Sequence, residues 1–200
     1  MKPTMIVLAG PNGAGKSTLH ATRVAPSFAG PFVNANVIQR DDMGDASPAA
    51  SYEAARIASS RRAELIQDGR DFVTETVFSH PSKLDLIEEA RSHGYTVILM
   101  HVGVDSPDLS VERVEVRVRE GGHAVPEEKV RARYDRGAAL IREAVRKADR
   151  GMVYDNSRLN RPPQHCLTFA NGRLTYAKAV LPAWIRSVYR PDLLVRQPKP

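Results

Sequence analysis

The segment Gly10-Pro-Asn-Gly-Ala-Gly-Lys-Ser17 constrains the fold more than any other part of the chain. It fits the phosphate-loop pattern G-x-x-x-x-G-K-[ST] at every defined position. Its glycines let backbone N–H groups turn inward around phosphate oxygens, and a following helix adds the positive end of its dipole. In this pattern Lys16 reaches the β and γ phosphates of a nucleoside triphosphate, and the Ser17 hydroxyl coordinates Mg²⁺. We therefore expect ATP or GTP to bind here. The residues expected to contact the nucleotide are Gly10, Pro11, Asn12, Gly13, Ala14, Gly15, Lys16, Ser17 and Thr18.

The segments around this loop predict strands that alternate with helices. The apolar run at residues 5–9 is typical of a buried strand, and residues 15 to about 25 predict the helix that follows the loop. Further strands are predicted at residues 32–35, 71–75, 95–102 and 152–154. Helices are predicted at residues 47–68, 82–94 and 106–121 and from residue 126 onward, because Ser-Pro and Pro start signals and glycine stops bound them.

This alternation predicts an α/β fold of the P-loop NTPase type, with a mainly parallel sheet and helices on both faces. A small C-terminal hairpin is predicted at residues 167–176, where Asn171-Gly172 forms the turn. We expect a single domain over residues 1–200, with its core at about residues 4–157 and a C-terminal extension at residues 158–200. The last residues, 197–200, are expected to be frayed.

The composition is that of a globular protein without a membrane-spanning segment. The hydrophobic share is 42% and the charged share 26%, and no window approaches the roughly 18 apolar residues that a spanning helix needs. The only cysteine, Cys166, cannot form an internal disulfide, which favours a cytoplasmic setting. The net charge of +6 suits phosphorylated small molecules as ligands. Nucleic acid is not expected, because no aromatic residues punctuate the arginines as a stacking platform would require.

Glu75 and Thr76 lie at the carboxyl end of a predicted strand, where ligands bind in open α/β sheets. Glu75 could hold a metal-bound water or a substrate hydroxyl; the alternative is a solvated loop carboxylate. An apolar strand that ends in Asp, the usual second signal of P-loop proteins, is missing after residues 95–102. This absence argues against a switch GTPase or a transporter-type ATPase and is compatible with a small-molecule kinase.

Five arginines flank the glycine pair Gly121-Gly122. Two arginine-bearing segments joined by glycines suit a lid that closes over phosphates, since guanidinium groups can neutralise a transferring phosphoryl group. The alternative is an exposed helix face with acidic partners. We expect at least one of the five to be catalytic. They are Arg113, Arg117, Arg119, Arg131 and Arg133.

The ordered set of motifs resembles the zeta toxin family, in particular its compact chromosomal branch of predicted ATPases. The resemblance rests on residues 10–18, 32–36, 72–76 and 112–126, extended by residues 133–134 and 153–156. It implies a kinase that transfers the γ-phosphate of ATP to the 3′-hydroxyl of a UDP-N-acetylamino sugar such as UDP-N-acetylglucosamine. It also implies the toxin of a toxin–antitoxin system, whose antitoxin protein can block the nucleotide site.

The resemblance also implies a role for each matching residue. Lys16 would grip the phosphates, Ser17 would hold magnesium, and Arg113 would reach the transferring phosphoryl group from the lid. Arg119 is predicted to be the second lid arginine, since only one residue separates it from the glycines. The residues implied to bind the acceptor are Asn34, Asn36, Glu75 and Thr76.

Asn36 departs from the family pattern, in which an aspartate at this strand end is expected to accept the proton of the substrate. An amide cannot accept that proton as a carboxylate can. Glu75 could serve as the base instead, as could Asp41 or Asp42 folded back into the site. Two other functions therefore stay open: a nucleotide-binding regulator with weak or no transfer activity, and a kinase for another small anionic acceptor.

Overall fold

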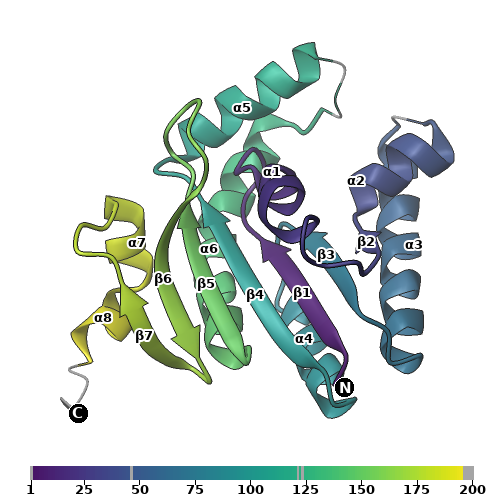
Figure 1. Cartoon of the computed structure of the whole chain (residues 1–200). Helices are drawn as coiled ribbons and strands as arrows, with labels where there is room; N and C mark the ends of the chain where they lie inside the picture. The colour runs from purple at the N-terminus through teal and green to yellow at the C-terminus, as the bar shows by residue number, and fades with distance from the viewer. Residues whose placement is uncertain (1, 46, 121, 123, 196–200) are drawn as a thin grey trace.

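The computed structural model describes residues 2–45, 47–120, 122 and 124–195, which form a seven-stranded sheet flanked by helices (Figure 1). The strand order is β2-β3-β1-β4-β5-β6-β7. Strands β1 to β5 pair in parallel, and β6 and β7 are added antiparallel. This sheet confirms the predicted α/β class. The strands are β1 (Thr4–Ala9), β2 (Phe32–Val33), β3 (Phe72–Thr76), β4 (Thr96–Gly103), β5 (Arg150–Asp155), β6 (Gln164–Ala170) and β7 (Arg173–Ala177).

The helices connect the parallel strands and continue beyond the last strand. Within the described residues, none of them combines the length and the apolar character needed to cross a membrane. The helices are α1 (Lys16–Leu19), α2 (Ala35–Val37), α3 (Pro48–Gln67), α4 (Ser82–Ser92), α5 (Pro107–Arg119), α6 (Glu127–Lys147), α7 (Ala183–Val188) and α8 (Arg190–Leu194). Two π-helical turns, η1 (His20–Val24) and η2 (Ile38–Met43), extend α1 and α2.

Helices cover both faces of the sheet, as Figure 1 shows. On one face, Leu19 of α1 and Val24 of η1 pack on Leu8 and Val102. On the other face, α3, α4, α6 and α7 bury a larger apolar cluster against the same strands. Strands that are covered on both sides need apolar residues on both sides, which explains the continuous apolar runs of β1 and β4.

The register of the central strands brings three carboxyl ends to one edge of the sheet. Ala9, the last residue of β1, pairs with Thr76 of β3 and with His101 of β4. The phosphate loop leaves β1 at this point, and β3 ends beside it with Glu75 and Thr76. Ligands bind at this edge in open α/β sheets.

The helix and turn signals of the sequence act as predicted. The Ser47 hydroxyl accepts a hydrogen bond from the Ala50 amide at 3.2 Å, and the Ser106 hydroxyl accepts one from the Leu109 amide at 3.2 Å. These caps start α3 and α5. Asn171-Gly172 joins β6 to β7 with φ angles of 48° and 75°, as a two-residue hairpin turn requires.

Two predicted elements are shorter than expected. The helix after the phosphate loop keeps α-helical geometry only to Leu19 and then widens into η1. The predicted strand at residues 32–35 ends at Val33, because the Asn34 side chain accepts a hydrogen bond from the Asn36 amide at 2.8 Å. That bond caps α2, a helix that the sequence analysis did not predict.

The C-terminal segment packs into the main core through two helices that were also not predicted. The side chains of Trp184, Ile185 and Tyr189 are all buried within the larger apolar cluster. The Trp184 indole donates a hydrogen bond to the Asp155 carboxylate at 2.8 Å. Residues 183–189 therefore support the carboxyl end of β5 rather than forming a separate appendage.

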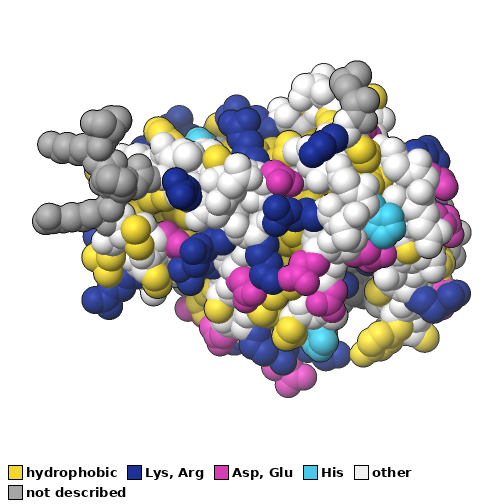
Figure 2. Space-filling model, turned by 90° about the horizontal axis from the view of Figure 1, so that it is seen from below, with side chains coloured by type: hydrophobic (Ala, Val, Ile, Leu, Met, Phe, Trp, Pro, Cys, Tyr) yellow, Lys and Arg dark blue, Asp and Glu magenta, His cyan; other side chains and the backbone are white. Residues whose placement is uncertain are grey.

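Charges of both signs are mixed at the amino ends of the strands. Figure 2, which views the molecule from below, shows basic and acidic side chains interspersed on this face. Here Lys147 pairs with Glu88, and Arg91 lies 3.7 Å from Asp149. The positive surplus of the chain is therefore not concentrated at this end.

His101 lies in a buried polar network at the end of β4. Its Nδ1 is 2.7 Å from the Tyr189 hydroxyl, and its ring packs edge-to-face on Trp184. Burial, and secondarily the charge of Lys16, lower the pKa of His101 from 6.5 to about 3. His101 is therefore neutral in the folded protein at neutral pH.

The buried histidine predicts a loss of stability in mild acid. Since the unfolded chain binds a proton near pH 6.5 and the folded chain does not, stability is complete above that pH and falls as pH decreases toward 3. One pH unit in this window is worth about 1.4 kcal/mol, so His101 costs about 2 kcal/mol between pH 7 and pH 5. We expect His101→Gln to reduce the difference between the free energies of unfolding at pH 7 and pH 5 by this amount in urea titrations. Equal pH dependence of parent and variant would contradict the assignment.

Candidate active site

The phosphate loop follows β1 along a path that requires glycine, as Gly10 and Gly15 illustrate. A Cβ on Gly10 would overlap the carbonyl oxygen of Val102 in the neighbouring strand. Gly15 has a φ of 87° and lies against the side-chain amide of Asn156. That amide donates a hydrogen bond to the Ala14 carbonyl at 2.9 Å and so fixes the loop from the end of β5.

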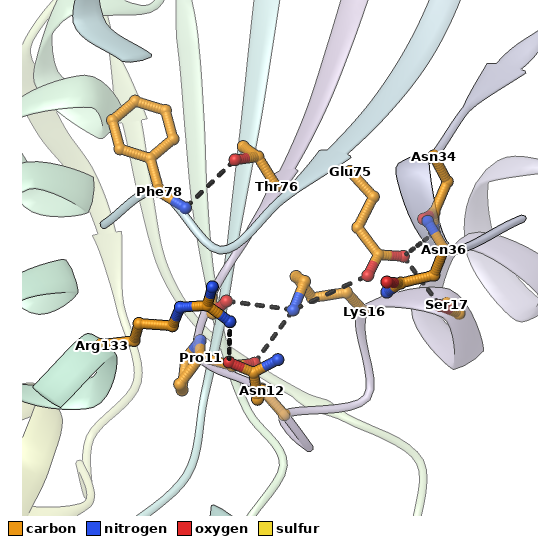
Figure 3. Close-up of polar contacts among 12 residues, drawn as sticks. Pro11, Asn12, Lys16, Ser17, Asn34, Asn36, Glu75, Thr76, Phe78 and Arg133 are labelled. Atoms are coloured by element: carbon orange, nitrogen blue, oxygen red, sulfur yellow. Dashed lines mark hydrogen bonds and ion pairs between the residues drawn. The ribbon is translucent and has the colours of Figure 1, made fainter. Parts of the chain in front are cut away.

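Lys16 is buried at the centre of the loop, with 6% of its surface exposed. Its Nζ donates hydrogen bonds to the carbonyls of Gly10 at 3.0 Å and Pro11 at 2.9 Å, and lies 3.7 Å from Glu75 Oε1 (Figure 3). Burial lowers the pKa of Lys16, and the Glu75 carboxylate opposes this shift. The ammonium group is therefore held beside the loop by one carboxylate and two carbonyls.

Glu75 joins three segments at the end of β3. Its Oε2 accepts hydrogen bonds from the Ser17 hydroxyl at 2.7 Å and from the Asn34 side-chain amide at 2.9 Å (Figure 3). Together with the contact to Lys16, these bonds occupy both carboxylate oxygens. The alternative that Glu75 is a solvated loop carboxylate is wrong, because its side chain is only 8% exposed.

The Ser17 hydroxyl and the Glu75 carboxylate suit a magnesium ion. Mg²⁺ prefers oxygen ligands, and in nucleotide sites it takes one or two from the protein and the others from phosphates and water. No group of three His, Cys, Asp or Glu side chains that could bind a metal alone occurs in the described part of the chain. Ser17 and Glu75 could therefore hold Mg²⁺ together with a bound triphosphate.

A cavity of about 260 Å³ opens beside these residues. Its lining includes Asn12 of the phosphate loop and four predicted acceptor residues: Asn34, Asn36, Glu75 and Thr76. Asn34 is buried and bonded to Glu75, whereas Asn36 is exposed on α2. The structure therefore brings all four residues to the same cavity.

The loop after β3 forms one wall of this cavity in a strained conformation. Phe78 is 1% exposed and has a φ of 58°, which is unfavourable for a bulky residue. The Thr76 hydroxyl accepts a hydrogen bond from the Phe78 amide at 3.1 Å and holds this turn (Figure 3). Local strain of this kind clusters at ligand sites.

The arginines of α5 and α6 divide into two groups. Arg113 packs beside Gly13, and the charge of Arg117 lowers the pKa of Lys16. Arg133 lines the cavity and lies 3.4 Å from the Asn12 side-chain oxygen (Figure 3). In contrast, Arg131 is paired with Glu127 and Asp108 on the surface.

Arg119 is exposed in the last turn of α5. Its role as a lid arginine stays a prediction, and Arg133 is a further candidate that the geometry offers. Gly121 of the expected hinge lies outside the described residues. Sequence spacing could not distinguish these arginines, because the fold of α6 against the phosphate loop decides which of them reaches it.

Sequence analysis named the phosphate loop and the acceptor residues but missed three contributors. Asn156 was named only within the matching segment 153–156, although it supports the loop from the end of β5. Arg62 of α3 and Lys83 of α4 line the cavity and were not singled out. Arg62 follows Ala54 and Ala58 at a spacing of four residues, so the sequence could have indicated an arginine on the apolar side of this helix.

The phosphate loop at the end of β1, with a cavity beside it, defines a P-loop protein of the kinase type. Comparison with known families identifies the particular group: the model described as Zeta toxin matches residues 1–161. The chain belongs to the Zeta toxin family.

Individual proteins resemble the chain at lower identity. An uncharacterized protein of Haemophilus influenzae is 29% identical over 139 residues, which cover 67% of this chain and 94% of that protein. The toxin–antitoxin system PezAT of Streptococcus pneumoniae has a similar fold, with a TM-score of 0.62, 18% identity, and coverage of 78% of this chain and 68% of that one. The complex AvrRxo1-ORF1:-ORF2 with ATP gives 0.66 at 16% identity, covering 96% of this chain and 63% of that one.

The buried ammonium group predicts a strong effect on nucleotide affinity. Lys16→Ala should weaken MgATP binding at least tenfold, about 1.4 kcal/mol, because it removes the cation that faces the phosphates. Calorimetric titration measures this change. The matched control is Lys129→Ala, which removes an exposed lysine of α6. If Lys16→Ala binds MgATP as tightly as the control, the assignment of the phosphate loop is wrong.

Proposed function

We propose that this protein is an ATP-dependent kinase that phosphorylates the 3′-hydroxyl of a UDP-N-acetylamino sugar, such as UDP-N-acetylglucosamine. The observation that carries the proposal is the position of Glu75. This carboxylate contacts Lys16 and Ser17 of the phosphate loop and also lines the adjoining cavity. A nucleotide on the loop and an acceptor in the cavity would therefore meet at one group. Membership of the Zeta toxin family supports the choice of reaction and acceptor.

The cations of the site would stabilise the phosphoryl group during transfer. Phosphoryl transfer depends on positioning and on neutralisation of charge. Lys16 would bind the phosphates from the loop, while Arg113 and Arg133 approach from α5 and α6. Burial lowers the pKa of both arginines, yet each stays charged at neutral pH because a guanidinium deprotonates only in strong alkali. Mg²⁺, held by Ser17 together with the phosphates, would supply further positive charge at the phosphate oxygens.

The acceptor hydroxyl needs an oxygen that accepts its hydrogen bond. Glu75 is the only carboxylate among the described residues that line the cavity. Asp41 and Asp42 are exposed and paired with Arg40 and Arg61, at 2.5 Å and 2.7 Å. They do not line the cavity. We therefore assign the base function to Glu75. The alternative is that the hydroxyl donates its hydrogen bond to the side-chain oxygen of Asn36, which would orient it.

A protein partner would complete a toxin–antitoxin system. PezAT, which is similar in fold, is a toxin–antitoxin system by its name, and AvrRxo1-ORF1:-ORF2, also similar in fold, is a complex of two proteins. We extend this to the present chain as a proposal: an antitoxin protein would block the nucleotide site. The second candidate function is a nucleotide-binding regulator with weak or no transfer, and the observation that favours it is the amide at position 36.

The central experiment is incubation with ATP, Mg²⁺ and a panel of metabolites, followed by mass spectrometry. We expect a UDP-N-acetylamino sugar to gain one phosphoryl group, because its hydroxyl would lie beside Glu75. Lys16→Ala serves as the blank that shows contaminating kinases. ADP formation without any phosphorylated acceptor would support the regulator, and a different phosphorylated metabolite would replace the proposed acceptor.

The two polar residues at the acceptor end should respond in opposite directions. Asn36→Asp adds a base where the family commonly has one, so we expect faster transfer, by up to about 10²-fold. This is the low end for a general base, because the loose transition state requires little proton removal. Glu75→Gln should slow transfer at least about tenfold. Initial rates at saturating ATP measure both.

The control for these variants is Asp42→Asn, which changes an exposed carboxylate of η2 and should leave the rate unchanged. If Asn36→Asp is no faster with every acceptor tested, Asn36 does not occupy the position of the base. If Glu75→Gln keeps the parental rate, Glu75 is not the base either.

A further inference from the structure

Two further cations, one from α3 and one from α4, line the same cavity. Neither belongs to the phosphate loop. Arg62 comes from the last third of α3 and Lys83 from the first turn of α4. The Arg62 side chain is almost fully buried, with 8% of its surface exposed. Lys83 is half-buried.

Neither cation has a counterion in the described part of the chain. Within it, no hydrogen bond or ion pair joins Arg62 or Lys83 to another residue, whereas other arginines of α3 are paired: Arg56 lies 2.6 Å from Glu53 and Arg61 2.7 Å from Asp42. Burial lowers the pKa of Arg62, and burial together with the charge of Arg62 lowers that of Lys83. A buried charge without a partner destabilises a fold.

The one carboxylate of the cavity is engaged elsewhere. Glu75 accepts hydrogen bonds from Ser17 and Asn34 and lies near Lys16. The electrostatic neighbours of Lys16 are Glu75 and arginines of α5 and α6, and not the pair on α3 and α4. Glu75 is therefore bonded to residues of the phosphate loop and of the segment after β2, and no ion pair joins it to Arg62 or Lys83.

We propose that Arg62 and Lys83 form a subsite that binds a phosphate group of the acceptor. This inference rests on the proposed function, since it assumes that the acceptor occupies the cavity while its hydroxyl faces Glu75. A guanidinium group offers a planar fork that matches two phosphate oxygens, and the adjacent ammonium adds a point charge. Two positive charges match the double charge of a phosphate or diphosphate group, whereas a carboxylate would neutralise only one. The diphosphate of a UDP-sugar carries such a charge and would occupy this subsite.

The unpaired charges of Arg62 and Lys83 should lower the stability of the protein when no phosphate is bound. Uncompensated like charges are destabilising, and they cluster at functional sites. Removal of the Arg62 charge with retention of its apolar stem should therefore raise the Tm of the protein in the absence of phosphate. Arg62→Met makes this change, and Arg56→Met is the matched control on an exposed turn of the same helix.

The test is thermal unfolding of the full chain with added sodium phosphate, with the phosphate loop saturated by a non-hydrolysable ATP analogue and Mg²⁺. Sodium chloride and sodium acetate at equal ionic strength are the comparison salts. At about ten times its dissociation constant, phosphate should raise the Tm of the parent and of Arg56→Met by about 3 °C. Arg62→Met and Lys83→Met should lose this rise. If Arg62→Met does not fold, Lys83→Met and Arg62→Lys are compared in its place. We expect loss of the rise in Lys83→Met and a smaller rise in Arg62→Lys, which keeps the charge without the planar fork.

Two results would overturn the subsite. One is an equal phosphate effect on the parent, Arg62→Met and Lys83→Met, which would place the binding elsewhere. The other is an equal effect of acetate, which would make the site a general anion site. Loss of the phosphate effect only in the Arg62 and Lys83 variants supports it.

Kinetics separate failure of the subsite from failure of the proposed function. If a phosphorylated acceptor is used, Arg62→Met should raise its KM at least tenfold with little change in kcat, while an acceptor that lacks the phosphate should not respond to the substitution. If Arg62→Met transfers the phosphoryl group with an unchanged KM for the phosphorylated acceptor, the subsite is wrong and the proposed kinase function stands. A phosphate effect that depends on Arg62, without transfer to any acceptor, would keep the subsite and remove the proposed reaction.

Discussion

The contact of Glu75 with Lys16 and Ser17 is the interaction on which the rest of the site depends. It joins the end of β3 to the start of α1. Asn34, which follows β2, donates a hydrogen bond to the same carboxylate. A buried ammonium alone would favour deprotonation, because desolvation penalises its charge. The carboxylate keeps that charge in place, so a nucleotide would meet a cation that is already positioned and dehydrated.

Parallel pairing of the strands makes this contact available. Since β3 lies beside β1 in register, Leu8 pairs with Glu75, and the carboxylate extends from the same edge as the phosphate loop. The C-terminal helices support this edge from another side, through Trp184 on Asp155 and Tyr189 on His101. The neutral state of His101 at neutral pH is a consequence of its burial at this edge.

The cavity combines an ordinary phosphate-loop end with a second cationic end that has no counterion among the described residues. The face at the amino ends of the parallel strands differs from this cavity, because charges of both signs are mixed there (Figure 2). In small-molecule kinases, an unpaired positive charge can serve in binding, because an anionic ligand supplies the missing counterion. An acceptor with a phosphate group would neutralise the charges of Arg62 on α3 and Lys83 on α4 while its hydroxyl is aligned with Glu75.

The sequence by itself determined the phosphate loop, the helix starts at Ser47 and Ser106 and the hairpin at Asn171-Gly172, because each depends on backbone geometry and hydrogen bonds within a few residues. Alternating strands and helices likewise fixed the fold class. The tertiary structure alone decided which distant side chains meet: Glu75 lies 58 residues from Ser17, and Arg133 lies 121 residues from Asn12. It also decided the burial of Arg62 and the packing of α7. Strand order and helix packing set these contacts, and local periodicity does not encode them.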